Sequence, residues 1–232
     1  MDLVWDGLTE ALRLIFNGDG YVFEVTATSL SISLGATAIS VVIGFSIALL
    51  LAFRSHTGRT LTISIFNAGM ALPPVVVGLV VAIMLWRTGP LGELRLLYTP
   101  TAIVVAQSVI AVPVVTALSI AALQSLHPKL RLQILALGAS RWQSAFLLFR
   151  EARLGLLAAV IAGFGAAISE VGATIMVGGN LRGSTRTLTS ATVLEVQQGD
   201  FETAIAFSVI LLTLIFVVVL GFTIVQQRRP SS

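Results

Sequence analysis

Five long apolar stretches with almost no charged residues dominate the pattern of hydrophobic and polar positions along the chain. Each is longer than the roughly 20 residues that a helix needs to cross the hydrocarbon core of a bilayer. A single acidic residue, Glu170, lies inside the fourth stretch. The pattern predicts an all-α, polytopic membrane protein with five transmembrane helices, at residues 25–53, 60–86, 101–126, 154–181 and 203–227.

A shorter segment at residues 1–20 has a different pattern. Apolar residues recur at helical spacing on one side, and charged residues occupy the other side. Because this segment is too short and too charged to span a bilayer, we expect an amphipathic helix of about four turns in the membrane interface, anchored by Trp5. The chain therefore divides into an interfacial helix at 1–20 and a membrane domain at 21–232.

The composition agrees with a membrane location and leaves few ligands for a metal. Hydrophobic residues make up 56% of the chain and charged residues only 11%, whereas soluble domains carry roughly 25% charged residues. The absence of cysteine excludes disulfide bonds and thiolate metal sites. The two histidines, His56 and His127, form no ligand cluster, so we interpret them as solvated loop residues and predict no metal site.

The distribution of basic residues between the loops predicts the orientation in the membrane. One set of loops carries nine Lys and Arg residues, and the other set carries five. Because cytoplasmic loops hold the excess of positive charge, the set with nine is assigned to the cytoplasm. This places the N-terminus outside, the C-terminus inside, and residues 127–153 in the largest cytoplasmic loop.

Two features inside the apolar stretches are candidates for a gate. Pro73 and Pro74 remove two backbone donors from the second stretch, which predicts a kink or break near its middle. The freed backbone groups must face either protein or a water-filled pathway, and the sequence leaves both open. Glu170 is either a gate or pathway residue, or a structural anchor that pairs with a donor such as Arg182 or Arg186.

The loop at 127–153 combines positive charge with exposed apolar positions. It holds five cationic residues against one acid, Glu151. Its centre reads as two short amphipathic helices joined at Gly138, with Ser140 as the N-cap of the second. An ordinary basic loop at the membrane interface is the simpler alternative. A structured loop, however, needs a partner or a packing site for its apolar residues, which are Leu132, Ile134, Leu135, Leu137, Trp142 and Phe146.

The centre of this loop, Leu-Gly-Ala-Ser-Arg-Trp at residues 137–142, resembles the cytoplasmic coupling loop of permease subunits of ATP-binding-cassette (ABC) importers. In that family the loop reads Glu-Ala-Ala, three residues, Gly, nine residues, Ile-x-Leu-Pro. Here Leu-Gln-Ile at 132–134 replaces Glu-Ala-Ala, and Arg-Glu at 150–151 replaces Leu-Pro. The resemblance implies that a separate cytoplasmic ATPase subunit couples through Leu137, Gly138, Ala139, Ser140 and Arg141.

A second run, at residues 169–189, looks like the tungstate permease family and is close to molybdate and sulfate permeases. It contains Glu-Val-Gly, Gly-Gly-Asn and Ser-Thr-Arg-Thr-Leu-Thr, and the resemblance covers most of the chain from Thr28 onward. It implies a type I ABC-importer permease, for which the gate or pathway candidates are Glu170, Thr174, Pro73 and Pro74. The loop at 178–203, which begins within this run, offers N–H groups, hydroxyls and cations to an anion at the outer mouth, or docks a binding protein; its candidates are Gly178, Gly179, Asn180, Arg182 and Arg186.

The sequence therefore predicts the permease subunit of an ABC importer for tungstate or a related oxyanion, with molybdate and sulfate as alternatives. The only lysine, Lys129, cannot complete a Gly-x-x-x-x-Gly-Lys loop, so we expect no catalytic residue and no cofactor here, and ATP is bound by the partner subunit. The implied partners are a cytoplasmic ABC ATPase, an extracytoplasmic substrate-binding protein, a second copy of this chain and the lipid bilayer, without nucleic acid. An ATP-independent secondary anion carrier is the alternative from another class, which a single intramembrane acid and the lack of a visible repeat disfavour.

Overall fold

The structure is a computed structural model that describes residues 2–53 and 57–227, and it has no strand within them. Three helices are long and apolar enough to cross a membrane, namely α2 (Gly20–Phe53), α5 (Pro100–Gln124) and α11 (Phe201–Gln227). Two bent pairs of consecutive helices are also long and apolar enough if each pair is taken as one span. These pairs are α3 (Arg59–Gly69) with α4 (Pro74–Leu85), and α8 (Arg153–Ile168) with α9 (Gly172–Gly178). The predicted all-helical membrane fold is confirmed, and the count of five holds if each bent pair is one span.

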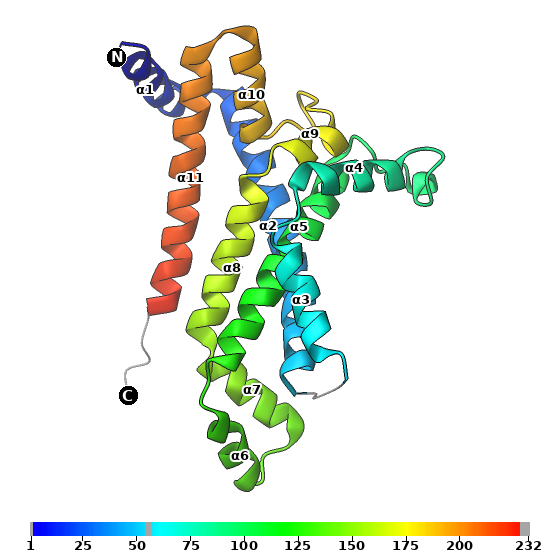
Figure 1. Cartoon of the computed structure of the whole chain (residues 1–232). Coiled ribbons are helices and arrows are strands. Elements are labelled where there is room, and N and C mark those ends of the chain that lie inside the picture. The colour runs from blue at the N-terminus through cyan, green and yellow to red at the C-terminus, as the bar shows by residue number, and fades with distance from the viewer. Residues whose placement is uncertain (1, 54–56, 228–232) are drawn as a thin grey trace.

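The second apolar stretch breaks at the predicted proline pair. Helix α3 ends at Gly69, and α4 begins at Pro74 after a bend of 99°. Proline suits the first position of a helix, where its missing N–H would have no partner. Beyond the bend α4 runs crosswise to the long helices and carries the 86–99 loop, with the short η1 (Gly92–Leu94), away from the bundle (Figure 1). Pro113, in contrast, lies inside α5 without ending it.

The fourth apolar stretch is also bent, which the sequence did not indicate. Helices α8 and α9 meet at 58° across the short break 169–171. The helix restarts at Gly172, where an added Cβ would lie 2.8 Å from Cγ2 of Val75 in α4. The two broken stretches are therefore packed against each other through a glycine.

The long helices form one elongated bundle with apolar contacts along its length. Helix α2 packs along α5, and α5 packs on α8. One buried cluster joins α2, α4, α5 and α9, and a second joins α2, α5 and α8 near the end of α2. A third cluster joins α1, α2, α10 and α11 at the opposite end. Within the fourth stretch, Gly163 permits this close packing, because an added Cβ would meet Val115 Cγ2 at 2.5 Å.

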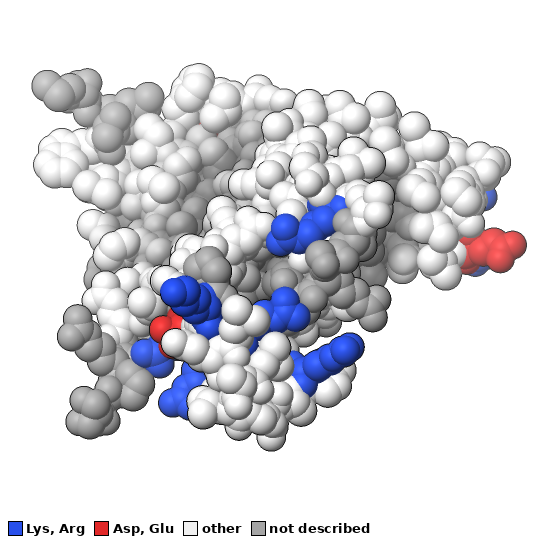
Figure 2. All heavy atoms as spheres, turned by 60° about the horizontal axis from the view of Figure 1, so that its bottom comes forward, with Lys and Arg blue, Asp and Glu red and all other residues white. Residues whose placement is uncertain are grey.

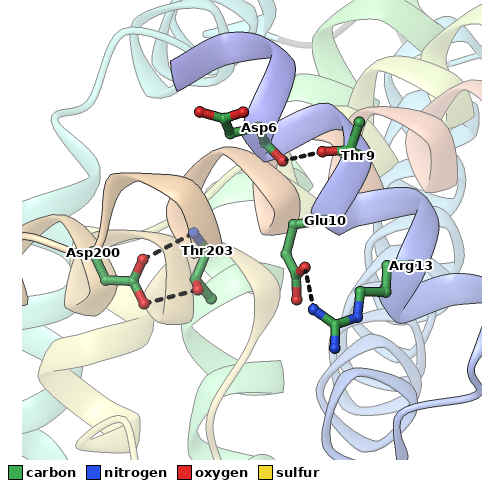
Figure 3. Close-up of polar contacts among 6 residues, drawn as sticks. All are labelled: Asp6, Thr9, Glu10, Arg13, Asp200 and Thr203. Carbon is green, nitrogen blue, oxygen red and sulfur yellow. Dashed lines mark hydrogen bonds and ion pairs between the residues drawn. The ribbon is translucent and has the colours of Figure 1, made fainter. Parts of the chain in front are cut away.

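The predicted amphipathic segment forms α1 (Asp2–Phe16), which packs on the beginning of α11 (Figure 3). At Gly7 an added Cβ would meet Ile205 at 2.5 Å, and Ala11 is fully buried. The polar side of α1 holds an ion pair of 3.5 Å between Glu10 and Arg13. One face of α1 thus belongs to the bundle, while its place in the membrane interface stays a prediction, with Trp5 67% exposed.

The segment expected to be a loop at 178–203 contains a further helix, α10 (Leu188–Gln198). Thr187 and Ser190 form a capping box at its start, and Gly199 ends it with φ +80°. Asp200 then caps α11 by accepting hydrogen bonds from Thr203 N and Thr203 Oγ1, at 3.1 and 2.8 Å (Figure 3). At the opposite end of the molecule, α6 (Pro128–Ala136) and α7 (Arg141–Glu151) form a separate knob below the bundle (Figure 1).

Candidate functional site

The knob has the local structure that the sequence predicted. Gly138 lies between α6 and α7 with φ +84°, a left-handed conformation that favours glycine. Ser140 caps α7: its Oγ accepts from Gln143 N at 3.3 Å, and Gln143 Oε1 accepts from Ser140 N at 2.8 Å. The capping box therefore satisfies two backbone donors at the start of α7 within the knob. The two-helix interpretation and the Ser140 cap are confirmed.

Five of the six apolar residues that the sequence singled out on the knob are at least 39% exposed. Of the six that need cover, Ile134 is buried. Leu137, Trp142 and Phe146 are 88%, 80% and 68% exposed, and they line a hollow of about 700 Å³, within the size range of ligand or partner pockets. A large exposed apolar patch of this kind marks an interaction surface.

The environment of Gly138 separates two expectations for a side chain at this position, which were a clash with backbone or a clash with the ATPase. A Cβ built there meets no atom of this chain within 4 Å, so the clash with its own backbone is ruled out. The backbone conformation favours glycine, and the space beside it is open. Ala139 and Arg141 flank this turn, half-buried and exposed respectively, so all five coupling candidates lie together on the knob.

Glu170 lies at the break between α8 and α9 and is 8% exposed. Its Oε1 accepts a hydrogen bond from Ala173 N at 2.8 Å. The expected pairing with Arg182 or Arg186 is absent among the described residues, because both guanidinium groups lie on the ring of Tyr21. The carboxylate instead satisfies a backbone donor where α9 begins.

The gate candidates divide into two groups around Glu170. Pro73, Pro74 and Glu170 line one hollow of about 330 Å³, where the two helix breaks face each other beside α5. Thr174 lies apart from it, fully buried, and its Oγ1 donates to the Glu170 carbonyl at 3.0 Å. Three of the gate candidates thus line one hollow, namely Pro73, Pro74 and Glu170. Thr174 lies outside it and contacts the backbone of Glu170.

Sequence reasoning missed two residues that hold this break. Gln107 of α5 is 2% exposed, and its Nε2 donates to Thr174 Oγ1 at 3.4 Å. Thr189 of α10 donates to the Glu170 carbonyl at 3.3 Å. The signal available in the sequence was an amide side chain, Gln107, inside an apolar stretch. Thr189 gave no signal, because only the fold brings α10 to the break.

The segment 178–187 is a closed turn rather than an open cradle for an anion. The N–H of Gly179 donates to Ile175 O, and the N–H groups of Ser184, Thr185 and Arg186 all donate to Leu181 O. Thr185 Oγ1 donates to Gly178 O. The expectation that these groups meet an oxyanion is therefore wrong for the donors that the turn already uses, while the outward-facing side chains remain available for docking.

The other outer candidates hold this turn against α2. Asn180 has φ +51° and accepts from Ser190 Oγ at 2.9 Å. Arg186 donates to the Tyr21 hydroxyl at 2.8 Å and to Asn180 O at 3.3 Å. Arg182 stacks over the Tyr21 ring at 4.5 Å and is exposed. All five outer candidates lie together, and Arg182 is the most accessible cation among them.

A bundle of apolar helices, two facing helix breaks around a buried carboxylate and a separate exposed knob define a multi-pass membrane transport subunit. The comparison with known families agrees. The chain belongs to the family described as binding-protein-dependent transport system inner membrane component, whose model matches residues 21–230.

The chain is similar over most of its length to curated transport permeases. It is 43% identical to a probable anion ABC transporter permease protein of Haloferax volcanii, covering 84% of this chain and 86% of the relative. It is 34% identical to the tungstate uptake system permease protein TupB of Peptoclostridium acidaminophilum, covering 94% and 96%. It is 29% identical to the molybdenum transport system permease protein ModB of Haemophilus influenzae, covering 77% and 82%.

The same fold occurs in a solved structure. The crystal structure of an amino acid ABC transporter with histidines matches with a TM-score of 0.62 at 18% identity, covering 91% of this chain and 94% of that chain. At this identity the likeness concerns the fold alone.

Proposed function

We propose that the chain is the membrane-spanning permease subunit of a type I ABC importer that translocates tungstate or a related oxyanion. The curated relatives support the substrate class, because their names include an anion, tungstate and molybdenum. Molybdate and sulfate remain the alternatives within this class. Sulfate is included because another relative is named for sulfate transport. The chain serves as a transport subunit, and the ATP is bound and hydrolysed by a separate subunit.

The observation that carries the coupling proposal is the knob formed by α6 and α7. Its apolar residues are exposed around a hollow, while its backbone is fixed by the Ser140 capping box. A rigid surface with uncovered apolar side chains fits a partner protein better than it fits solvent. The cytoplasmic ATPase subunit is the proposed partner, and its closure on ATP would move the knob together with α5 and α8.

The proposed orientation places the knob in the cytoplasm and the N-terminus outside. Lys and Arg side chains gather over the knob end, where acidic side chains are sparse (Figure 2), as the positive-inside rule requires. Three of the nine cations assigned to this side, Arg54, Arg228 and Arg229, lie outside the described residues. The turn at 178–187 would then face the extracytoplasmic binding protein.

A second copy of the chain is the proposed partner within the membrane. Helix α4 runs crosswise and begins at Pro74, directly after the break in the gate region. Four of its apolar residues are 48–58% exposed, namely Val76, Leu79, Val80 and Ile83. A pathway between two copies would bring two such gates together. With up to five spans in one chain, the dimer would surround the pathway with up to ten.

The decisive experiment is reconstitution of the chain with its cognate ATPase and binding protein in vesicles. We expect ATP hydrolysis to rise when the binding protein is loaded with tungstate, and to rise less with molybdate or sulfate. Binding of the three oxyanions to the isolated binding protein, measured in parallel, assigns the selectivity. Oxyanion uptake by the chain alone, driven by a proton or sodium gradient, would instead establish the secondary carrier.

A further inference from the structure

A second hollow lies on the knob beside the apolar surface proposed for the ATPase, and its lining includes Arg141, one of the five coupling candidates. It has a volume of about 510 Å³ and lies between the end of α2 and the two knob helices. Leu49 and Leu50 of α2 form one wall, and Arg131 of α6 and Arg141 of α7 line another part. Trp142 borders both hollows, whereas Leu137 and Phe146 border only the ATPase surface. The second hollow is therefore mostly apolar, with two arginines on one part of its lining.

The polar part of this hollow suits an anion. Its lining includes Arg131 and Arg141 and, among the described residues, no Asp or Glu. Arg presents several N–H groups in a planar fork that matches the oxygens of a phosphate. Ser144 also lines the hollow, is 1% exposed, and its hydroxyl has no hydrogen-bond partner among the described residues. A buried hydroxyl without a partner is costly unless a ligand or water satisfies it.

The apolar part lies beside the last turn of α2, and the length of this helix indicates how that turn sits relative to a bilayer. Helix α2 has 34 residues and is roughly 50 Å long, against a hydrocarbon core of about 30 Å. Its last turn therefore extends into the interfacial layer, and Leu49 and Leu50 lie four and three residues before its end at Phe53. Leu50 is 56% exposed and Trp142 is 80% exposed, and tryptophan is enriched at this level of a membrane.

Size distinguishes a lipid from a free anion. A tetrahedral oxyanion would displace only a few water volumes of about 30 Å³ each, so it would leave most of the hollow of about 510 Å³ empty. A phosphodiester headgroup with its glycerol and the first acyl carbons fills both parts. The charge selects an anionic headgroup, because a choline or ethanolamine group would bring a cation beside two arginines.

We propose that this hollow binds an anionic phospholipid of the leaflet next to the knob. Arg131 and Arg141 bind the phosphate, and Leu49, Leu50 and Trp142 contact the glycerol and upper acyl chain. Basic pockets beside transmembrane helices recognise lipid headgroups in this way. The bound lipid would tie the knob to α2. If the ATPase subunit sits on the neighbouring surface, as proposed above, coupling would depend on anionic lipid.

Lipid binding can be measured on the purified full-length chain without an ATPase, so its outcome is independent of the proposed transport function. Native mass spectrometry would count bound phosphatidylglycerol and phosphatidylcholine under matched conditions. We expect a preference for phosphatidylglycerol that falls about tenfold in the Arg131→Gln/Arg141→Gln double variant. Arg150→Gln is the matched control, because this cation lies on the same knob outside the lining of the hollow, and it should retain the preference.

Ser144→Ala keeps the proposal testable if the double variant fails to fold. Without lipid its melting temperature should be unchanged or raised, because an unpartnered hydroxyl is removed; the rise caused by phosphatidylglycerol should be smaller than in the parent. Equal binding of both lipids, or equal loss in Arg150→Gln, would overturn the proposal. Displacement of phosphatidylglycerol by inorganic phosphate or tungstate would reassign the hollow to a free oxyanion, and displacement by the isolated ATPase would reassign it to the partner surface.

Discussion

At the scale of single residues, the carboxylate of Glu170 acts through the backbone. It accepts from Ala173 N where α9 begins, inside a hollow shared with Pro73 and Pro74. A direct ligand for a divalent oxyanion would have to be protonated, because like charges repel strongly in a low dielectric. The geometry thus favours an anchor that fixes the bend between α8 and α9.

We predict that Glu170→Ala loosens the closed state, because the N–H of Ala173 is left buried without its partner, at a cost of about 1–3 kcal/mol. In reconstituted vesicles the basal ATPase rate should rise relative to the rate stimulated by the binding protein. Glu170→Gln is the matched control: its side-chain oxygen can still accept, so coupling should be weakened less. A change in apparent substrate affinity alone would contradict the anchor role.

A second residue-scale prediction concerns Gly138, whose backbone is left-handed and whose surroundings are open. Asp and Asn both tolerate this conformation, so Gly138→Asp and Gly138→Asn should insert into the membrane like the parent. Asp places a charge beside Leu137 and Phe146, and we expect it to abolish ATPase association, measured by co-purification. Asn, of the same shape without the charge, should retain more of it. Normal coupled transport with Asp would refute the assignment of the knob.

At the scale of helices, the number of membrane crossings determines which loops lie on the same face of the membrane. The knob and the turn at 178–187 lie at separate levels of the bundle (Figure 1). Helices α8 and α9 together connect them, provided that this bent pair crosses the membrane once. The native chain has no cysteine, which makes single-cysteine labelling of both ends direct.

We predict that Ser184→Cys, in the exposed outer turn, reacts with a membrane-impermeant thiol reagent in intact cells. Gln133→Cys, exposed on α6, should react only after permeabilisation, and a reporter fused after Arg229 should behave as cytoplasmic. The cysteine-free parent is the control. Labelling of both positions from the same side would rule out the five-span topology.

At the scale of the whole molecule, the crosswise helix α4 suggests how two copies meet. Its exposed apolar residues continue from the gate region, whereas those of α11 lie on a long helix along the side of the bundle (Figure 1). If two copies enclose one pathway, the gate side must be the interface. The opposite side is then left to lipid.

This arrangement predicts that Val80→Cys on α4 gives a covalent dimer with a short bifunctional thiosulfonate in native membranes. Val217→Cys on α11 has a similar exposure, 58% against 50%, and should stay monomeric. The measurement is the fraction of dimer on a denaturing gel at increasing dilution into lipid. Efficient crosslinking through α11 with none through α4 would place the interface elsewhere.

The sequence by itself determined the parts of this protein that depend on local pattern. The long uncharged stretches require helices in a bilayer, because lipid offers no hydrogen-bond partner to the backbone. The break at Pro73 and Pro74, the left-handed Gly138 and the Ser140 cap follow from the chemistry of those residues. The family resemblance in the 137–142 and 169–189 runs also lies in the sequence.

Only the tertiary structure decided what depends on neighbours distant in the chain. The bend at Glu170 has no proline, and it is held by Gln107 through Thr174 and by Thr189 from α10. The sequence suggested Arg182 and Arg186 as partners for Glu170, but the fold places both on Tyr21 of α2. A buried polar group takes whichever partner the packing brings within hydrogen-bond distance, and one-dimensional spacing does not contain that information.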